Sequence, residues 1–234
     1  MFKWPAINLQ KTNQISESSG AYDGGATGAM TGIIAGTSVA TSMGWRDVVA
    51  LQEGDMVLTF DGGLQQLKSI SRSLIWNGRG DCPKAFWPLQ VPKGALENAK
   101  EMQVLPRQGV MLESDIADEV LGDPFALIPA AALEGVRGIE RVYSTNPVEV
   151  ITLGFEDDQI VFAEQGALLF CAAGKDIVQD ALMGLATPCP YKMLSEASAI
   201  HLARGLETRE TSESCLESFR AALTDRGAGD GVAA

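Results

Sequence analysis

The chain has 234 residues, 46% of them hydrophobic, and its 18 Lys and Arg against 30 Asp and Glu give a net charge of −12. That apolar content excludes a disordered polymer, and the length fits one domain with extensions or two very small ones. The acidic balance argues against a nucleic-acid partner and against a polybasic membrane-surface protein, because both need a surplus of Lys and Arg.

Histidine and cysteine are scarce. The single histidine, His201, excludes any site that needs two imidazoles. No Cys-x-x-Cys pair occurs, so the sequence predicts neither a metal site nor a cofactor. Buried thiols in a reducing compartment are the favoured interpretation, with one or two disulfides in an exported chain as the alternative. The cysteines are Cys82, Cys171, Cys189 and Cys215.

Residues 1–31 are interpreted as an N-terminal arm. Two interpretations fit its composition: a flexible tail, or an arm that docks on a partner through Phe2 and Trp4. The start has no apolar stretch of the length that a signal peptide needs, which favours the cytoplasm or an assembled particle over Sec export. Residues 24–45 carry no charge, but they are mostly Gly, Ala, Thr and Ser, so we expect no membrane span.

From residue 37 the pattern changes to short β-branched and apolar runs separated by turns, which is typical of an all-β domain. A strand bent at Pro106 and a short helix at 114–121 are also predicted, with a loop at 77–92. The predicted strands cover 37–41, 45–51, 56–60, 64–75 and 102–112, and β-and-loop segments follow at 124–133, 136–142, 148–155 and 159–162.

The pattern becomes helical after residue 190. Ser195 is predicted to cap one helix, and the residues from Ser214 to Glu217 fit a capping box for a second. Gly227 suits the end of the second helix. Residues 191–234 are therefore expected to form a helical appendix and a tail.

The segment from residue 36 to 63 resembles the opening block of bacterial Hint (hedgehog/intein) domains. Gly36-Thr37 matches the Gly-Thr strand, and the run from Leu51 through Gly54-Asp55 to Val57 matches the Leu-x-x-Gly-Asp-x-Val hairpin. The segments 102–112, 125–130, 136–142 and 148–162 are similar to later blocks. The resemblance implies a mostly β, compact Hint-like fold over about residues 32–190.

The resemblance also implies where a Hint reaction centre would lie. The family's nucleophilic Cys or Ser corresponds to Gly32, which has no side chain to attack the preceding carbonyl. A family histidine corresponds to Gln108, whose amide cannot shuttle a proton near neutral pH. A further frequent histidine falls at Asp158. The match therefore implies a retained fold with a degenerate site and no catalytic residue.

A displaced nucleophile is the alternative. Thr31 lies beside the expected position and Thr37 lies on the first predicted strand, so self-cleavage between Thr31 and Gly32 or close by stays open. A threonine hydroxyl needs a base to act, and no histidine is near in sequence.

Three aromatic residues cluster in the segment 75–90. Trp76, Phe86 and Trp87 are candidates for a binding patch, although covering the end of a β core is the favoured interpretation.

The leading functional hypothesis is a non-catalytic Hint-fold module that acts as a structural or protein-interaction component of a larger assembly, such as a phage-like particle. The arm and the C-terminal helices would contact a protein partner or a second copy. The alternative is a self-cleaving Hint-type peptidase.

Overall fold

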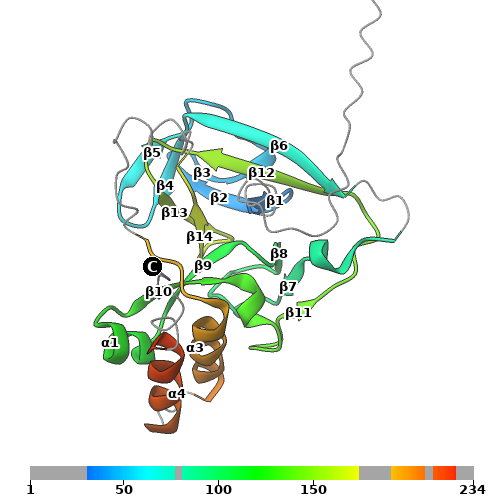
Figure 1. Ribbon diagram of the computed structural model, residues 1–234. Coiled ribbons are helices and arrows are strands. Elements are labelled where there is room, and N and C mark those ends of the chain that lie inside the picture. Colours follow the sequence, from blue (N-terminus) through cyan, green and yellow to red (C-terminus); the bar gives the residue numbers. More distant parts are fainter. Residues whose placement is uncertain (1–30, 77–80, 174–190, 209–212, 225–234) are drawn as a thin grey trace, which may run out of the picture.

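Short strands form two sheets in the computed structural model, which describes residues 31–76, 81–173, 191–208 and 213–224 (Figure 1). The chain is mostly β, as predicted. Residues 1–30 of the arm, with Phe2 and Trp4, and residues 225–234, with Gly227, lie outside the described residues.

The first sheet has six strands, and its two-residue strand β1 lies between two partners far away in sequence. Ile33 of β1 pairs with Val104 on one side and with Ile151 on the other, both antiparallel. The order is β11 (Glu140–Arg141), β7 (Leu89–Val91), β8 (Met102–Val104), β1 (Ile33–Ile34), β12 (Val148–Gly154) and β6 (Ser69–Trp76).

The second sheet has eight strands and carries the two N-terminal hairpins. Strand β3 (Gly44–Asp47) pairs with β2 beside the main path of the sheet. The path runs β10 (Phe125–Pro129), β9 (Gly109–Glu113), β14 (Ala167–Cys171), β13 (Gln159–Ala163), β2 (Ser38–Thr41), β4 (Met56–Thr59) and β5 (Gly63–Gln66).

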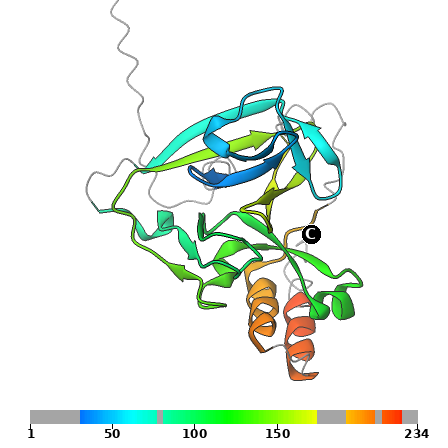
Figure 2. The ribbon, with the colours of Figure 1, turned by 180° about the vertical axis from the view of Figure 1, so that it is seen from behind.

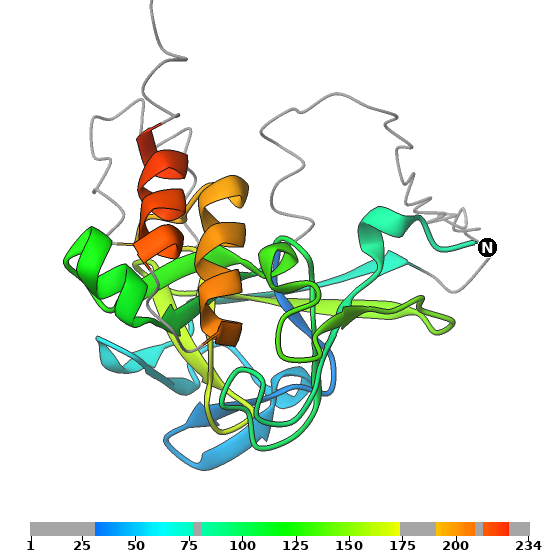
Figure 3. The same ribbon diagram turned by 90° about the horizontal axis from the view of Figure 1, so that it is seen from below.

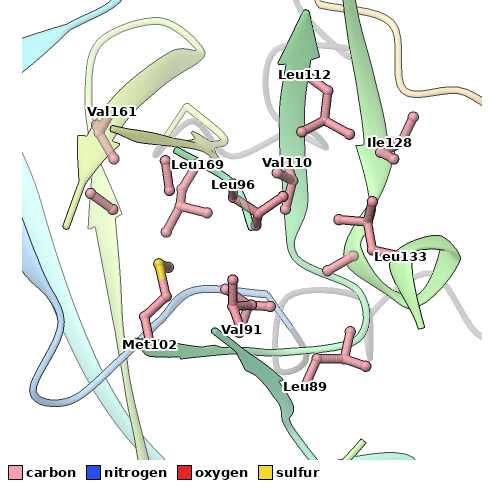
Figure 4. Close-up of a cluster of buried hydrophobic side chains, with 14 of the residues drawn as sticks. Leu89, Val91, Leu96, Met102, Val110, Leu112, Ile128, Leu133, Val161 and Leu169 are labelled. Atoms are coloured by element: carbon pink, nitrogen blue, oxygen red, sulfur yellow. The ribbon is translucent and has the colours of Figure 1, made fainter. Parts of the chain in front are cut away.

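The main core draws apolar side chains from both sheets (Figure 4). Val110 and Ile128 point into it from neighbouring strands of the second sheet, while Leu89 and Met102 enter from the first sheet. Burial of this apolar area is the main favourable term in folding. The core therefore accounts for where much of the 46% apolar content goes.

Three helices gather at one end of the molecule, next to β10 and away from β6 and β12 (Figures 1 and 2). Viewed from below, α3 (Glu196–Thr208) and α4 (Glu213–Thr224) lie side by side, with α1 (Asp115–Leu121) adjoining (Figure 3). Leu202 and Phe219 from the two longer helices are fully buried in the main core cluster. Within the part of the chain that the structure describes, no helix is both long and apolar enough to cross a membrane.

The helix caps follow the sequence in one case and differ in the other. Ser195 Oγ accepts a hydrogen bond from the Ser198 amide at 3.1 Å, which confirms the predicted cap of α3. α4 instead begins at Glu213, one residue before the predicted cap Ser214.

Several predicted strands are wrong in extent because the chain changes direction inside them. At 45–51, the Asp47 carboxylate accepts the Val49 amide at 2.9 Å and starts the 3-10 turn η2 (Val48–Ala50) instead of a longer strand. The segment 64–75 divides into β5 and β6, which belong to different sheets. The segment 102–112 divides likewise, because a turn after Leu105 carries the chain from β8 in the first sheet to β9 in the second.

Other predicted segments contain elements that periodicity does not show. The predicted loop 77–92 contains η3 (Lys84–Phe86) and β7, and the end of 124–133 forms η4 (Ala130–Leu133). Of the segment 136–142, only Glu140–Arg141 is a strand.

Candidate functional site

The two family positions Gly32 and Gln108 meet where the first sheet approaches the second. Gly32 directly precedes β1, and Gln108 directly precedes β9 at the end of the turn that links the sheets. The backbone amide of Gly32 donates a hydrogen bond to Gln108 Oε1 at 2.8 Å. We call this contact and the groups around it the junction, meaning Gly32, Gln108, Gly109, Val150 and Phe170.

The Gln108 side chain is 1% exposed and its amide is fully engaged. Besides accepting from Gly32, it donates through Nε2 to the carbonyl of Phe170 at 2.7 Å and to that of Gly109 at 3.1 Å. A carboxamide has two donor hydrogens and one acceptor oxygen, and all are used here. Gln108 therefore joins Gly32 beside the first sheet to β9 and β14 in the second.

The backbone at Gly32 leaves no room for a side chain. Its φ is +132°, in the region that L residues rarely adopt. A Cβ atom there would lie 2.6 Å from Val150 Cγ1, 3.1 Å from the Ile151 carbonyl oxygen and 3.1 Å from Thr152 Oγ1. A nucleophilic side chain at this position would need the Val150 side chain to move and the backbone to keep an unfavourable φ.

Asp158, the third family position, is tied elsewhere. Its carboxylate accepts a hydrogen bond from the Ala173 amide at 2.6 Å, which closes the open end of the β13–β14 hairpin. His201 lies on α3 and is half-buried. The contacts of the structure thus join Gly32 with Gln108, and they give Asp158 a role at the end of a hairpin.

Three threonines lie close to this region in sequence or in space. The Thr37 residue is 4% exposed, and its backbone carbonyl accepts from the Val48 amide at 2.9 Å at the open end of the β2–β3 hairpin. Thr31 precedes Gly32 and is half-buried. Sequence reasoning missed Thr152, whose Oγ1 lies 3.1 Å from the position that a Gly32 Cβ would take. Only the approach of β12 to β1 brings it there.

The three candidate aromatic residues pack beside the junction. Trp76 is 9% exposed, and Phe86 and Trp87 are half-buried against a cluster that includes Val150. Trp87 Nε1 donates to the Cys82 carbonyl at 2.7 Å, and its ring meets Tyr143 edge to face at 5.2 Å. This packing is typical of aromatic residues that close the end of a core.

The described thiols are buried and free. Burial raises the pKa of Cys82 above its ordinary value and raises the pKa of Cys171 from 9.0 to about 12. Neither group is therefore a ready nucleophile, since the thiolate is the reactive form. The side chains of Cys189 and Cys215 lie outside the described part.

A metal centre finds no support in the described ranges. No group of three or more His, Cys, Asp or Glu side chains there is placed to hold a metal ion.

Comparison with known proteins gives a family match over most of the β region. A family model described as a Hint domain matches residues 31–168. A search of curated proteins returned no match.

Solved structures of intein-type domains are similar at low identity. A bacterial intein-like domain from Clostridium thermocellum is 14% identical, with a TM-score of 0.44, over 60% of this chain and 99% of that one. The gp41-1 intein is 15% identical, with a TM-score of 0.37, over 60% and 98%. The MchDnaB-1 intein is 16% identical, with a TM-score of 0.38, over 60% and 99%.

Proposed function

The chain belongs to the Hint domain family, and we propose that it is a non-catalytic member that serves as a structural or protein-interaction component of a larger assembly. The observation that carries this proposal is the conformation of Gly32. Its positive φ and the 2.6 Å approach of Val150 to a would-be Cβ favour glycine at the position of the nucleophile.

The direction of the hydrogen bond at Gly32 supports the same proposal. Breaking the peptide bond before Gly32 requires its nitrogen to receive a proton as it leaves. Gln108 instead accepts the hydrogen of that nitrogen, and both of its own amide hydrogens are held by the carbonyls of Gly109 and Phe170. The arrangement stabilises the intact backbone and offers no proton to the leaving group.

The proposed contact elements lie at opposite ends of the sequence. The arm with Phe2 and Trp4 and the C-terminal helices would meet a protein partner or a second copy, with the half-buried Phe86 and Trp87 as a further candidate surface. A phage-like particle is one such assembly. The charge of −12 supports a protein partner over a nucleic acid.

Intact-mass measurement of freshly made protein tests the absence of catalysis. We expect a single species of 24.8 kDa that does not change on incubation with a thiol or with hydroxylamine. A fragment that lacks the residues before Gly32 would overturn the proposal.

One observation favours self-cleavage as the second candidate. Thr152 Oγ1 lies 3.1 Å from where a Gly32 Cβ would be. Attack on the Thr31 carbonyl would form an ester to Thr152 and free Gly32 as a new amino terminus, and hydrolysis of that ester by water would then release residues 1–31. That step requires a base for the hydroxyl proton and an acid for the nitrogen.

The variant Thr152→Val tests whether Thr152 is the nucleophile of such a cleavage. If a fragment forms in the unaltered chain, it must disappear in Thr152→Val and persist in Ser71→Ala, which removes the hydroxyl of the residue paired with Thr152 across β6 and β12. Loss in both variants would point to a disturbed strand pair and would contradict the role of Thr152.

A further inference from the structure

A cleft of about 570 Å³ opens on the face of the second sheet that is turned away from the main core. Met111 and Leu127 belong to this face, because their neighbours Val110 and Ile128 point into the core. The cleft is closed at its sides by the turn after β4, by the end of α1 and by the segment 191–195 that leads into α3. Its volume is in the range of sites that bind small molecules or side chains.

The floor of the cleft is aromatic and sulfur-rich, and it is only half-buried. Phe60 and Phe125 meet edge to face at 4.9 Å, and Tyr191 and Met193 lie beside them. Each of these four side chains keeps part of its surface exposed. Such a surface favours an aromatic or sulfur-containing apolar group as its occupant.

The rim of the cleft carries two carboxylates. Asp61 accepts a hydrogen bond from the Tyr191 hydroxyl at 2.5 Å, and Asp123 accepts the amide of Phe125 at 2.9 Å. Lys192 is also on the lining, which leaves the rim with one net negative charge. An occupant with aromatic groups and a positive charge fits both the floor and the rim.

The arm has this composition. Its first nine residues include Phe2, Lys3, Trp4, Ile7 and Leu9. Residues 1–16 contain two lysines and no acidic residue, so they carry a charge of +2. The rest of the chain carries −14, which gives the total of −12.

No other segment outside the described ranges has the same chemistry. The segments 77–80, 174–190, 209–212 and 225–234 contain no aromatic residue. The two longest of them, 174–190 and 225–234, each have two acidic residues and one basic residue. Charge complementarity to the acidic rim therefore favours the arm.

The arm is long enough to reach the cleft within one molecule. The 26 residues between Trp4 and Thr31 span at most about 90 Å when fully extended. A domain of roughly 200 residues has a radius of gyration of only about 16 Å. A tether of this kind gives an effective concentration on the order of 1 mM, which favours docking within the chain over docking on a second copy.

We propose that residues 2–9 of this chain dock in the cleft of the same molecule, with the aromatic side chains on the Phe60–Phe125 floor and Lys3 at the acidic rim. This inference goes beyond the proposed function and does not depend on it, since the junction takes no part in the docking. An arm held in this way covers an apolar surface, and a partner that binds the arm must first displace it.

The experiment records methyl resonances of Met111 and Met193 in the full-length chain labelled with 13C-methyl methionine. We expect both resonances to shift in Trp4→Ala, because the indole ring current is removed from the cleft. They should stay in place in Trp45→Ala, which removes an exposed tryptophan from β3. Lys3→Glu should produce part of the Trp4→Ala shift, since it weakens the contact with the rim.

Two outcomes would overturn the proposal. Unchanged Met111 and Met193 resonances in Trp4→Ala would show that the arm does not occupy the cleft. The second outcome is a difference between the unaltered chain and Trp4→Ala that disappears on tenfold dilution. If light scattering also shows a dimer that Trp4→Ala dissociates, the arm docks on a second copy. Intact mass is read separately from the resonances: a fragment that lacks the residues before Gly32 would count against the non-catalytic proposal, whereas a full-length chain with unchanged resonances in Trp4→Ala would count against the docking alone, so failure of the two proposals is distinguishable.

Discussion

The junction at Gly32 and the cleft on the second sheet both contain polar side chains beside apolar ones, but these polar groups differ in exposure and in their hydrogen bonds. At the junction the Gln108 carboxamide is buried, and its oxygen and both hydrogens are engaged within the protein. At the cleft the carboxylates of Asp61 and Asp123 make exposed contacts above a half-buried aromatic floor.

This difference separates a position that stabilises the fold from one that is available to a ligand. A buried amide whose oxygen and both hydrogens are engaged within the protein contributes to stability and has no donor left for a new partner. Exposed carboxylates beside partly exposed rings keep acceptor sites and apolar surface that a partner can still contact. The same kind of substitution should therefore have a large effect on stability at the junction and a small one at the cleft.

Gln108→Leu should give the largest loss of stability. The variant keeps the approximate volume but leaves the Gly32 amide and the carbonyls of Gly109 and Phe170 without their partner. At about 1–3 kcal/mol for each buried group left unpaired, with Gly32 half-exposed, we expect a loss of about 4 kcal/mol in the free energy of unfolding. Urea denaturation measures it, with an unchanged m-value as the sign of an intact native state.

Gln103→Leu is the matched control for that substitution. Gln103 lies on β8, and its Nε2 donates to Gln90 Oε1 at 2.9 Å in a partly exposed pair. Loss of this hydrogen bond should lower the free energy of unfolding by less than about 1 kcal/mol. Equal costs for the two glutamines would contradict the view that the junction couples the two sheets.

Gly32→Cys should come next, with a loss of about 3 kcal/mol. The new side chain would adopt an unfavourable backbone conformation and collide with Val150 Cγ1. The double variant Gly32→Cys with Val150→Ala removes the collision but not the backbone strain. In a double-mutant cycle measured by thermal or urea denaturation, the double variant should be about 1 kcal/mol more stable than the sum of the two single losses predicts. If the two losses simply add, Val150 does not restrict the side chain at residue 32.

The sequence could indicate the residues at the junction but not their contact. The sequence indicates Gly32 by its spacing from Gly36-Thr37 along the chain, and Gln108 by its spacing from Pro106, because these positions match the family pattern. Their hydrogen bond depends on the turn after Leu105, whereas the sequence predicts only a bend within one strand there. Thr152 and Val150 approach Gly32 only because β12 pairs with β1, and a two-residue strand such as β1 is too short to show a period.

The cleft was harder to predict from sequence for a related reason. Phe60, Phe125 and Tyr191 are separated by 65 and 66 positions in the chain, so no local spacing connects them. Strands β9, β10, β13 and β14 are apolar on both faces, and strand β14 was not predicted at all. An apolar run of that length fits a buried helix segment as well as a strand, and alternation cannot decide between them.

Alkaline pH should destabilise the protein through Cys171. This residue follows Phe170, whose carbonyl accepts a hydrogen bond from Gln108. In the unfolded chain the thiol ionises from its ordinary pKa of 9.0, whereas in the fold its pKa is about 12. The unfolded state therefore loses its proton first, and stability falls as the pH rises from 9 towards 12. About 1.5 pH units above the ordinary value the loss from this group should be about 2 kcal/mol.

The variant Cys171→Ala isolates this contribution. Its stability is lowered at neutral pH by the smaller side chain, but the difference between the variant and the unaltered chain should shrink as the pH rises above 9. Cys82→Ala is a control with a partly exposed neighbourhood and a thiol whose pKa is raised to a smaller extent. A constant difference between Cys171→Ala and the unaltered chain from pH 7 to 10.5 would contradict the assignment.

Tyr191→Phe should have the smallest effect, because it removes only the hydroxyl that binds Asp61 at the exposed rim of the cleft. Water can replace that partner on both groups, so the loss should be about 0.5 kcal/mol, several times less than for Gln108→Leu. The ring stays in contact with Phe170, whose centroid lies 6.2 Å away. A loss as large as that of Gln108→Leu would mean that the rim stabilises the fold as the junction does. The cleft would then be a closed part of the structure and not a surface kept open for the arm.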